Sequence, residues 1–338
     1  MCAKYARSMF LHALGHFHPD TVISNAFLES LEIETSNQWI VERVGIHKRH
    51  TVLPLDYIRH TRNQDPRAAL EAATLSNAQT GARAAQMALA RAKLTVADIG
   101  LVLAGGCSPD ECIPSEAARV SELMQIDAPS LDIASACSSF GAQLYFLEGM
   151  RPERLPDYVL VVNAENSTRV VDYSNRNSCV LWGDASSAAI LSPRIPGPWK
   201  VTQTMLRGDP SGADKVKVPR FGHFTQNGSA VQHFAIKRGG EVFDELRGRY
   251  LASGGTPEQL TFIGHQANLR MLEAITRRSE IPDAQHRYNV DNRGNTGAAG
   301  APSVLSELWD DPNLTDAIAL CVVGSGLTWA GALLQRSA

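Results

Sequence analysis

Short apolar runs alternate with helical patterns along most of this chain. Apolar residues at helical spacing occupy 81–93, and a continuous apolar run follows at 101–106. Helices that alternate with fully apolar strands are typical of a parallel sheet covered on both faces, so the pattern predicts an α/β fold. Two more strands are predicted at 158–162 and 317–323 on the same grounds.

The same order of elements returns in the second part of the chain. The helix, turn and strand that end at the glycine pair 105–106 are matched by a helix at 241–251 and a strand at 261–263, which Gly264 follows. The strand-to-helix turn within 131–140 is matched by 288–297. A repeat of this kind predicts an internal duplication with equivalent strand ends facing one cleft.

The duplication divides the chain into two like halves, 1–195 and 196–338. Within the first half, 36–46 is predicted as a capped helix that Gly45 ends. Residues 53–80 are polar and irregular, which indicates a surface segment of loops and helices near the opening of a functional site.

Composition places the chain among ordinary globular proteins. Its 338 residues are 44% hydrophobic and 20% charged, which allows a sizeable core. A net charge of −3 with interspersed signs argues against a nucleic acid or a membrane surface as partner. No apolar run is long enough to span a bilayer, and residues 1–18 make a poor signal peptide, so we expect a cytoplasmic protein.

The cysteines and histidines do not predict a metal site. The six cysteines are Cys2, Cys107, Cys112, Cys137, Cys179 and Cys321. They are widely spaced in a large chain, so we expect them to be reduced. Cys107 and Cys112 lack partners at zinc spacing and are interpreted as loop or core thiols, and a cluster of His12, His16 and His18 is expected to be structural or solvated.

Cys137 is the candidate nucleophile. It lies where a short apolar strand gives way to a helix, and the free N–H groups and positive dipole of a helix start stabilise a thiolate. A lone cysteine is more often a buried apolar side chain. However, the duplication brings His265 and Asn295, at equivalent turns, toward the same place. A nucleophile, two polarising donors and the small residues of 324–329, whose N–H groups can approach an oxyanion, indicate acyl transfer through a thioester.

These residues resemble the β-ketoacyl-acyl-carrier-protein synthase III family of the thiolase superfamily. The resemblance covers nearly the whole chain. Its motifs stand in the family's order: Ala136-Cys137-Ser138, Gly264-His265-Gln266-Ala267-Asn268-Leu269-Arg270, Asn292-Arg293-Gly294-Asn295-Thr296 and Gly324-Ser325-Gly326-Leu327-Thr328-Trp329. The resemblance implies a thiolase-like fold with a five-layered α-β-α-β-α architecture.

The resemblance also implies a reaction. Cys137 would take an acyl group from acyl-coenzyme A, with the backbone N–H groups of Cys137 and Ser325 as the oxyanion hole. His265 and Asn295 would then bind the thioester carbonyl of a malonyl group, and decarboxylative Claisen condensation would give a β-ketoacyl thioester. No metal or redox cofactor is implied. The implied partners are acyl-coenzyme A, an acyl carrier protein and a second copy of the chain.

Four residues are assigned to coenzyme A and its pantetheine arm. Trp39 and Arg43 are four residues apart and share one helix face. By themselves they fit a packed tryptophan beside a solvated arginine; by resemblance they belong to the family's coenzyme A entrance. Arg176 would clamp the adenine end, and Asn268 would bind pantetheine.

The predicted helix at 241–251 departs from the family's pattern. It is shorter than in housekeeping members, and Asp244 stands where a carrier-docking lysine is often found. Docking of a carrier protein would then depend on Arg247, Arg249 and Arg270.

The acyl pocket shows further departures. Ile113 and Val323 replace aromatic residues, which would leave room for a longer or bulkier acyl group. Ile113 belongs to a loop-helix, 107–121, that is similar to the one that completes the pocket of the neighbouring subunit. Glu116 is either an unusual acid at this loop or a solvated carboxylate at a helix start. These features, with the long 53–80 segment, favour the specialised synthases of secondary metabolism.

Three alternatives stay open. The first is an acyltransferase of the same fold, which would need only one base to move the acyl group from Cys137 to an alcohol or amine. The second is a non-decarboxylating thiolase-type enzyme, for which Cys321 is misplaced within a predicted strand. The third is a silent partner subunit, against which an intact set of Cys137, His265 and Asn295 argues.

Overall fold

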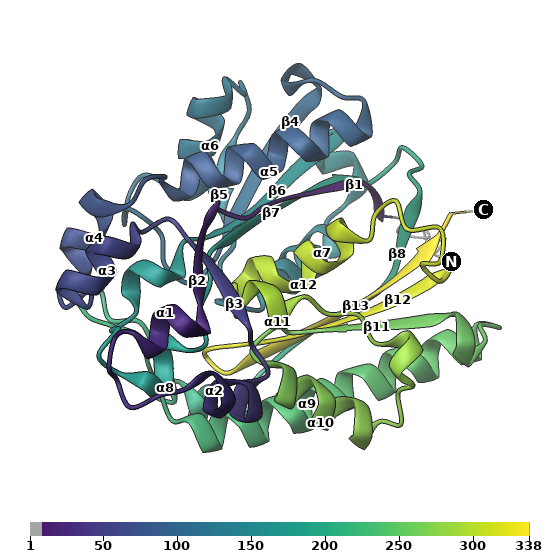
Figure 1. Ribbon diagram of the computed structural model, residues 1–338. Helices are drawn as coiled ribbons and strands as arrows, with labels where there is room; N and C mark the ends of the chain where they lie inside the picture. The colour runs from purple at the N-terminus through teal and green to yellow at the C-terminus, as the bar shows by residue number, and fades with distance from the viewer. Residues whose placement is uncertain (1–8, 338) are drawn as a thin grey trace.

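The computed structural model describes residues 9–337, in which helices pack on both faces of one large sheet (Figure 1). The sheet has nine strands in the order β11-β12-β13-β8-β1-β7-β6-β4-β5. Their bounds are β1 Met9–Phe17, β4 Ile99–Gly105, β5 Ser130–Asp132, β6 Tyr158–Glu165, β7 Ala185–Ser192, β8 Trp199–Gly208, β11 Leu260–Gly264, β12 Ala317–Gly324 and β13 Thr328–Arg336. Two strand pairs stand apart: β2 Thr21–Ser24 with β3 Lys48–Thr51, and β9 Val216–Lys217 with β10 Thr225–Gln226. Cys2 lies outside the described residues.

The helices are distributed along the whole chain. They are α1 Asn25–Glu29, α2 Asn37–Val44, α3 Leu55–Thr61, α4 Pro66–Ala72, α5 Asn77–Ala92, α6 Glu116–Met124, α7 Ser139–Gly149, α8 Arg176–Cys179, α9 Gly228–Ala252, α10 Leu269–Arg278, α11 Val290–Arg293 and α12 Gly300–Glu307.

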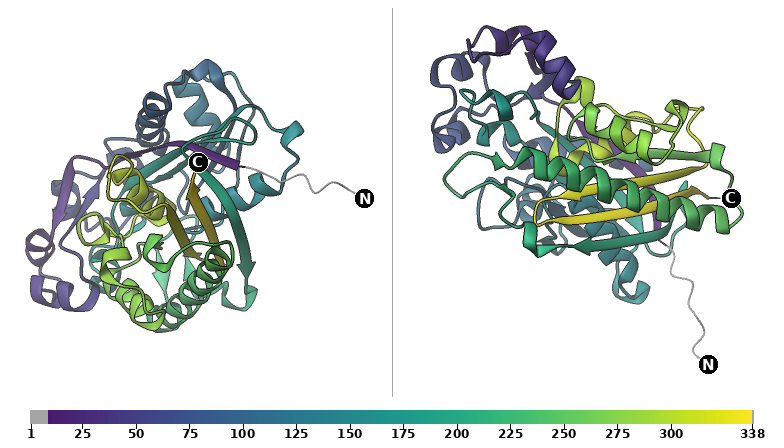
Figure 2. Two further views of the ribbon diagram at one scale, coloured as in Figure 1. Left: turned by 90° about the vertical axis from the view of Figure 1, so that its right-hand side faces the viewer. Right: turned by 90° about the horizontal axis from the view of Figure 1, so that it is seen from below.

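The two halves of the sheet form two β layers, with α7 and α12 between them and other helices on their outer faces, so the helices and strands stack in five layers. Helices α5 and α6 pack on the strands of the first half, and α9 packs on β12 and β13 with α10 beside it (Figures 1 and 2). Helix α7 contacts strands of both halves, β4 and β6 as well as β8 and β13, and α12 contacts β1 and β7 as well as β11 and β12. One buried apolar cluster accordingly joins Phe140 and Leu144 of α7, Leu305 of α12, and strand residues from both halves such as Leu11 and Leu320. The expected α-β-α-β-α architecture is confirmed.

The strand order shows the internal duplication. From the seam between β1 and β8, the first half continues β7-β6-β4 and the second continues β13-β12-β11. The matched pairs have the same directions: β4 and β11 run parallel to β6 and β12, and the other pairs are antiparallel. β5 has no full counterpart, since only an isolated parallel bridge from Phe262 to His286 stands in its place. The division at residue 195 stays a prediction.

Helix α9 is longer than predicted. It spans 25 residues, Gly228–Ala252, instead of 241–251. Two adjacent glycines, Gly239 and Gly240, stand just before the predicted start. Both are buried, and a Cβ on them would lie 2.9 Å from Ile275 and 3.1 Å from Arg278 of α10. The glycines therefore serve the close approach of two helices.

Of two other predicted segments, one agrees with the prediction and one differs from it. Residues 53–80 form α3, α4 and the start of α5, which confirms the expected mixture of loops and helices. The stretch before Asn295 is the four-residue helix α11 and not a strand. Its neighbours hold it in place, since Asp291 accepts a hydrogen bond from His47 N–H in the loop before β3.

Candidate active site

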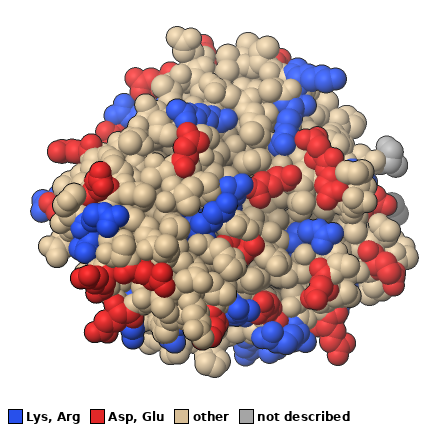
Figure 3. Space-filling view, in the orientation of Figure 1, with Lys and Arg blue, Asp and Glu red and all other residues tan. Residues whose placement is uncertain are grey.

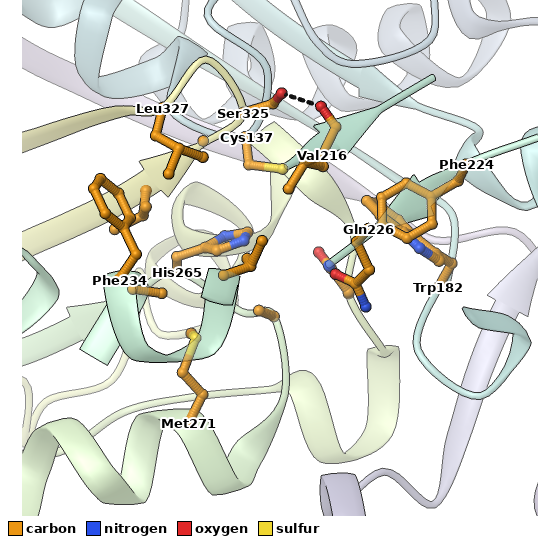
Figure 4. Close-up of a pocket in the computed structure, with 16 residues that line it drawn as sticks. Cys137, Trp182, Val216, Phe224, Gln226, Phe234, His265, Met271, Ser325 and Leu327 are labelled. Carbon is orange, nitrogen blue, oxygen red and sulfur yellow. Dashed lines mark hydrogen bonds between the residues drawn. The ribbon is translucent and has the colours of Figure 1, made fainter. Parts of the chain in front are cut away.

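A cavity with about 500 Å³ of empty volume lies where the two halves meet (Figure 4). Its lining is mostly apolar and comes from both halves. The residues are Cys137, Trp182, Val216, Phe224, Gln226, Val231, Phe234, Ala235, His265, Ala267, Met271, Asn295, Val323, Gly324, Ser325 and Leu327. The structure thus brings together Cys137, His265, Asn295, Ser325 and Val323, while the aromatic lining residues were missed by sequence reasoning.

Cys137 lies in a tight turn between β5 and α7. The turn is strained at Ala136, whose φ is +47°, a left-handed conformation that L-residues rarely adopt. Ser138 caps the turn, because its Oγ lies 2.7 Å from Ser135 O and 2.7 Å from Thr328 Oγ1 of β13. Gly324 passes so close that a Cβ on it would stand 2.7 Å from Ser135 O. The end of β12 and the start of β13 therefore fix the cysteine turn.

Cys107 is the nearest ionisable neighbour of the candidate nucleophile. It follows β4, which pairs with β5 in parallel, and its Sγ lies 3.5 Å from Cys137 Sγ. The hydrogen bond from Cys107 lowers the pKa of the Cys137 thiol well below its usual value, and His265 acts in the same direction. The same pair interaction raises the pKa of Cys107. Cys137 is therefore the thiolate of the pair and Cys107 its donor.

His265 follows β11 directly and is buried. The next residue, Gln266, fixes the loop: its Nε2 donates to Gly264 O at 2.7 Å, and its Oε1 accepts from the N–H groups of Asn289 and Val290 at 3.1 and 3.2 Å. His265 Nδ1 is buried and has no hydrogen-bond partner among residues 9–337. The imidazole borders the same cavity as Cys137 (Figure 4).

Asn295 is held by its backbone and by its own side chain. Its N–H donates to Leu181 O at 2.8 Å, and its carbonyl accepts from Gly183 N–H at 3.0 Å. Its Oδ1 accepts from Gly297 N–H at 3.1 Å. Because the amide oxygen is engaged in this way, Nδ2 is the group that the side chain can offer to a carbonyl in the cavity.

Glu165, at the end of β6, was not found from the sequence. Its carboxylate accepts hydrogen bonds from Cys107 N–H at 3.1 Å and from Ala298 N–H at 2.8 Å. Burial raises the pKa of Glu165 to about 7, and the nearby negative charge of Cys137 adds to the rise. The carboxylate joins the turn after β4 to the turn that follows Asn295, so it links the two halves behind the cavity.

Three residues assigned to the coenzyme A entrance lie together. The guanidinium of Arg43 lies 5.3 Å from the Trp39 ring centroid, and that of Arg176 lies 5.1 Å from it. Trp39 and Arg43 come from α2 and Arg176 from α8. A flat aromatic ring flanked by guanidinium groups is a surface on which an adenine can stack.

The fourth residue assigned to this group, Asn268, does not line the cavity. It caps α10, because its Oδ1 accepts from Met271 N–H at 2.8 Å. Its role toward pantetheine stays a prediction.

The three arginines expected to dock a carrier protein are engaged within the chain. Arg247 pairs with Asp244 at 3.0 Å, and Arg249 pairs with Glu245 at 2.7 Å. Arg270 pairs with its own helix and donates to Val41 O and Glu42 O of α2. Figure 3 shows both signs of charge interspersed on the face seen in Figure 1. Carrier docking through these arginines stays a prediction.

The two residues assigned to the acyl pocket separate in the structure. Val323 lines the cavity, whereas Ile113 does not and is 85% exposed on the loop between β4 and α6. The interpretation of Glu116 as a solvated carboxylate is wrong. Its side chain is buried at the start of α6, where its Oε1 accepts from Asp110 N–H at 3.1 Å, and burial raises its pKa to about 7.

The histidine cluster has structural partners. His16 lies 2.8 Å from Ser306 Oγ, and His18 lies 3.3 Å from the Glu307 carboxylate. In the described part of the chain, no three His, Cys, Asp or Glu side chains are arranged to hold a metal ion. Nor does any helix within residues 9–337 combine the length and the apolar character needed to cross a membrane.

Comparisons with known proteins agree with this site. Family models described as 3-oxoacyl-[acyl-carrier-protein (ACP)] synthase III and as its C-terminal part match residues 131–210 and 252–336. The chain is 32% identical to a β-ketoacyl-[acyl-carrier-protein] synthase III of Alkalilimnicola ehrlichii, over 98% of this chain and 99% of the relative. The corresponding protein of Sulfurovum sp. is 31% identical over 95% and 94%.

A solved structure gives the same answer for the fold. The 3-oxoacyl-[acyl-carrier-protein] synthase III of Aquifex aeolicus superposes with a TM-score of 0.84 at 26% identity, over 97% of this chain and 100% of that one. The fold, the arrangement of Cys137, His265 and Asn295 around one cavity, and relatives above 30% identity over nearly the full length point the same way. The chain belongs to the β-ketoacyl-acyl-carrier-protein synthase III family.

Proposed function

We propose that this protein is a decarboxylative condensing enzyme that joins an acyl group from acyl-coenzyme A to a malonyl thioester. The observation that carries the proposal is the meeting of Cys137, His265 and Asn295 at one largely apolar cavity. The names of the relatives support it, since they describe synthases that act with an acyl carrier protein.

The first half-reaction is acylation of Cys137. The thiolate, favoured by Cys107 and His265, attacks the thioester carbonyl of acyl-coenzyme A. The negative charge that develops on the carbonyl oxygen is stabilised by the backbone N–H groups of Cys137 and Ser325, which border the same cavity. The bond to the coenzyme A sulfur then breaks, and coenzyme A leaves as the thiol.

The second half-reaction is condensation. Nδ2 of Asn295 and the imidazole of His265 donate to the thioester carbonyl of the malonyl group. Loss of carbon dioxide leaves an enolate whose charge these donors stabilise. The enolate carbon attacks the acyl carbonyl on Cys137, a carbon–carbon bond forms, and the bond to the cysteine sulfur breaks to release the β-ketoacyl thioester.

No metal or redox cofactor is required in this scheme, because decarboxylation supplies the driving force. The adenine end of coenzyme A is bound at Trp39, between α2 and α8, where it displaces one of the two guanidinium groups from the ring. Val323 and the apolar lining suit a larger acyl group, which favours a specialised over a housekeeping role. The active form is a homodimer in which Ile113 reaches the partner's pocket.

The test is intact-protein mass spectrometry after incubation with acyl-coenzyme A thioesters of increasing length. We expect a mass gain on Cys137 with at least one of them, and its discharge by malonyl-coenzyme A or a malonyl carrier protein with release of carbon dioxide. An adduct that only an alcohol or amine discharges would replace the proposal with the acyltransferase. No adduct with any thioester would overturn it.

A further inference from the structure

The condensation described above uses one thiol, but the structure places two at the site. Cys107 Sγ and Cys137 Sγ are 3.5 Å apart, about 1.5 Å more than the length of a disulfide bond. Both residues are partly exposed. Because Cys137 borders the cavity that must admit an acyl chain, a molecule as small as hydrogen peroxide can reach it.

The surroundings of the pair allow the two sulfurs to approach each other. Cys107 is the second residue after β4 and lies in a segment without helix or strand that ends only at Glu116. Cys137 lies in the tight turn between β5 and α7. β4 and β5 are adjacent parallel strands, with Ala104 opposite Asp132, so the loop and the turn leave the same sheet edge side by side. A small shift of the Cys107 loop closes the gap.

The electrostatics of the pair suit an oxidation that begins at Cys137. A thiolate is far more reactive toward peroxide than a thiol, and the lowered pKa belongs to Cys137. The raised pKa of Cys107 keeps its side chain protonated as a thiol next to the Cys137 thiolate. This is the arrangement of an attacking and a resolving cysteine.

We propose that Cys107 and Cys137 form a reversible oxidative modification site, in which peroxide converts the two thiols into a disulfide that closes the active site and protects the nucleophile. In the first step the Cys137 thiolate attacks peroxide: a sulfur–oxygen bond forms, the oxygen–oxygen bond breaks and hydroxide leaves. In the second step Cys107 sulfur attacks the sulfenic sulfur of Cys137. The sulfur–sulfur bond forms, and the oxygen leaves as water with the proton of Cys107.

The net reaction balances. Two thiols lose two electrons and two protons, and one peroxide is reduced to two waters. A dithiol reductant reverses the disulfide by thiol–disulfide exchange. Without Cys107, further peroxide would carry the sulfenic acid on to sulfinic and sulfonic acids, which such a reductant does not restore.

The experiment treats the reduced full chain with limiting hydrogen peroxide, blocks remaining thiols with N-ethylmaleimide, and maps the peptides by mass spectrometry. We expect a cross-linked pair of peptides that contain Cys107 and Cys137, lighter by two hydrogen atoms than the reduced pair. Acyl-enzyme formation should be lost with it and return on treatment with dithiothreitol. Absence of this cross-link in the wild-type protein, with Cys137 found as sulfinic acid, would overturn the proposal.

Variants separate a resolving role from simple proximity. In Cys107→Ser we expect peroxide to drive Cys137 to sulfinic acid, with no activity recovered by dithiothreitol. The matched control is Cys112→Ser, which removes an exposed thiol from the same loop and should keep both the cross-link and the recovery. If Cys107→Ser recovers as the wild type does, Cys107 is not the resolving thiol. The cross-link is detected by mass spectrometry of the peptides and does not depend on an activity assay. Its presence or absence therefore tests this proposal independently of the condensing reaction.

Discussion

The sulfur of Cys137 is activated by residues from both halves of the chain. Cys107 comes from the first half and His265 from the second, and both lower the pKa of the thiol. In the repeated architecture these two residues are counterparts. Cys107 follows β4, and His265 follows β11, which is the strand that corresponds to β4 in the second half. The duplication thus places a thiol on one side of the nucleophile and an imidazole on the other.

The contribution of Cys107 is testable at the residue scale. In Cys107→Ala the thiolate loses a hydrogen-bond donor, so the pKa of Cys137 should rise. The rate of alkylation of Cys137 by iodoacetamide, followed against pH, measures this shift. Cys112→Ala is the control and should leave the profile in place. An unchanged profile in Cys107→Ala would remove Cys107 from the activation of Cys137.

In the proposed scheme acylation needs Cys137 but not Asn295, whereas condensation needs both, so their variants should fail in different ways. Cys137→Ala should form no acyl-enzyme. Asn295→Ala should form it at close to the wild-type rate and then condense about 10²- to 10³-fold more slowly, the loss typical of one oxyanion donor. Single-turnover assays of each half-reaction make the distinction, with the exposed Asn313→Ala as control. Equal loss of both half-reactions in Asn295→Ala would contradict its assignment to condensation.

Among the elements, the end of β12 makes a strict steric demand on the cysteine turn. A Cβ on Gly324 would lie 2.7 Å from Ser135 O and 2.8 Å from Ser138 N, both backbone atoms of the cysteine turn. Neither can yield as a flexible side chain would. Gly324→Ala should therefore displace Cys137, abolish acylation and lower the free energy of unfolding by about 1–3 kcal/mol.

A matched glycine shows the opposite behaviour. Gly248 is exposed in α9, and a Cβ on it would have no neighbour within 4 Å. Gly248→Ala should raise the free energy of unfolding by about 0.5–1 kcal/mol, since alanine is the better helix former. Urea unfolding and acyl-enzyme formation measure both variants. Normal acylation in Gly324→Ala would show that the cysteine turn tolerates the displacement.

The elements also show what can be predicted from the sequence. The strands at 158–162, 261–263 and 317–323 were predicted because each is a short, mostly apolar run, and the composition of such a run indicates burial in the sheet. The start of α9 was missed because the adjacent glycines 239 and 240 lower helix propensity. These glycines are needed because α10, which is distant in sequence, packs closely against them, and a local sequence pattern does not show that contact.

Some residues of the site could likewise be predicted from the sequence, and others could not. Cys137, His265 and Asn295 were found through the repeat and through motifs that resemble a known family. Cys107 and Glu165 carry no motif of their own, and their proximity to the site arises only from the packing of β4, β5 and β6. The repeat did hold one signal, because the glycine pair before Cys107 was matched with the residues around His265.

At the scale of the whole molecule, stability should depend on a neutral histidine. His50 Nε2 accepts from Arg293 at 2.8 Å, so its proton is on Nδ1, which donates to Pro19 O at 2.6 Å. Burial lowers the pKa of His50 to about 4 from its usual 6.5. The unfolded chain therefore binds more protons between pH 6.5 and pH 4, and the contribution present above pH 6.5 is lost as the pH falls through this window.

The prediction concerns a difference between proteins. The stability that wild type has over His50→Gln should shrink on acidification from above pH 7 to about pH 5, by on the order of 1–2 kcal/mol. The exposed His60→Gln should show no such change. Urea unfolding at a series of pH values gives each free energy. A difference that stays constant with pH would rule out His50 as an acid-sensitive group. Comparing variants cancels the opposite effect of Glu165 and Glu116, whose raised pKa values favour the folded state at lower pH.

The free edge of the sheet is the expected place for a second copy. Within residues 9–337, β5 is the last strand of the sheet and pairs only with β4, and Leu131 at its centre is 46% exposed. Sedimentation velocity at micromolar concentration should show a dimer for the wild type and a monomer for Leu131→Lys. Leu70→Lys on α4, where the leucine is 45% exposed, is the control and should remain dimeric. A monomeric wild type would contradict the proposed assembly.

The middle layer has a consequence for newly made protein. Helices α7 and α12 each pack against strands of both halves, and Cys137 and Asn295 lie a few residues before them in the chain. Until both halves have closed on these helices, Cys137 lacks His265, one of the two side chains that lower the pKa of its thiol. A nascent or partly unfolded chain should therefore react more slowly with the thioesters around it, and full reactivity becomes a sign that folding is complete.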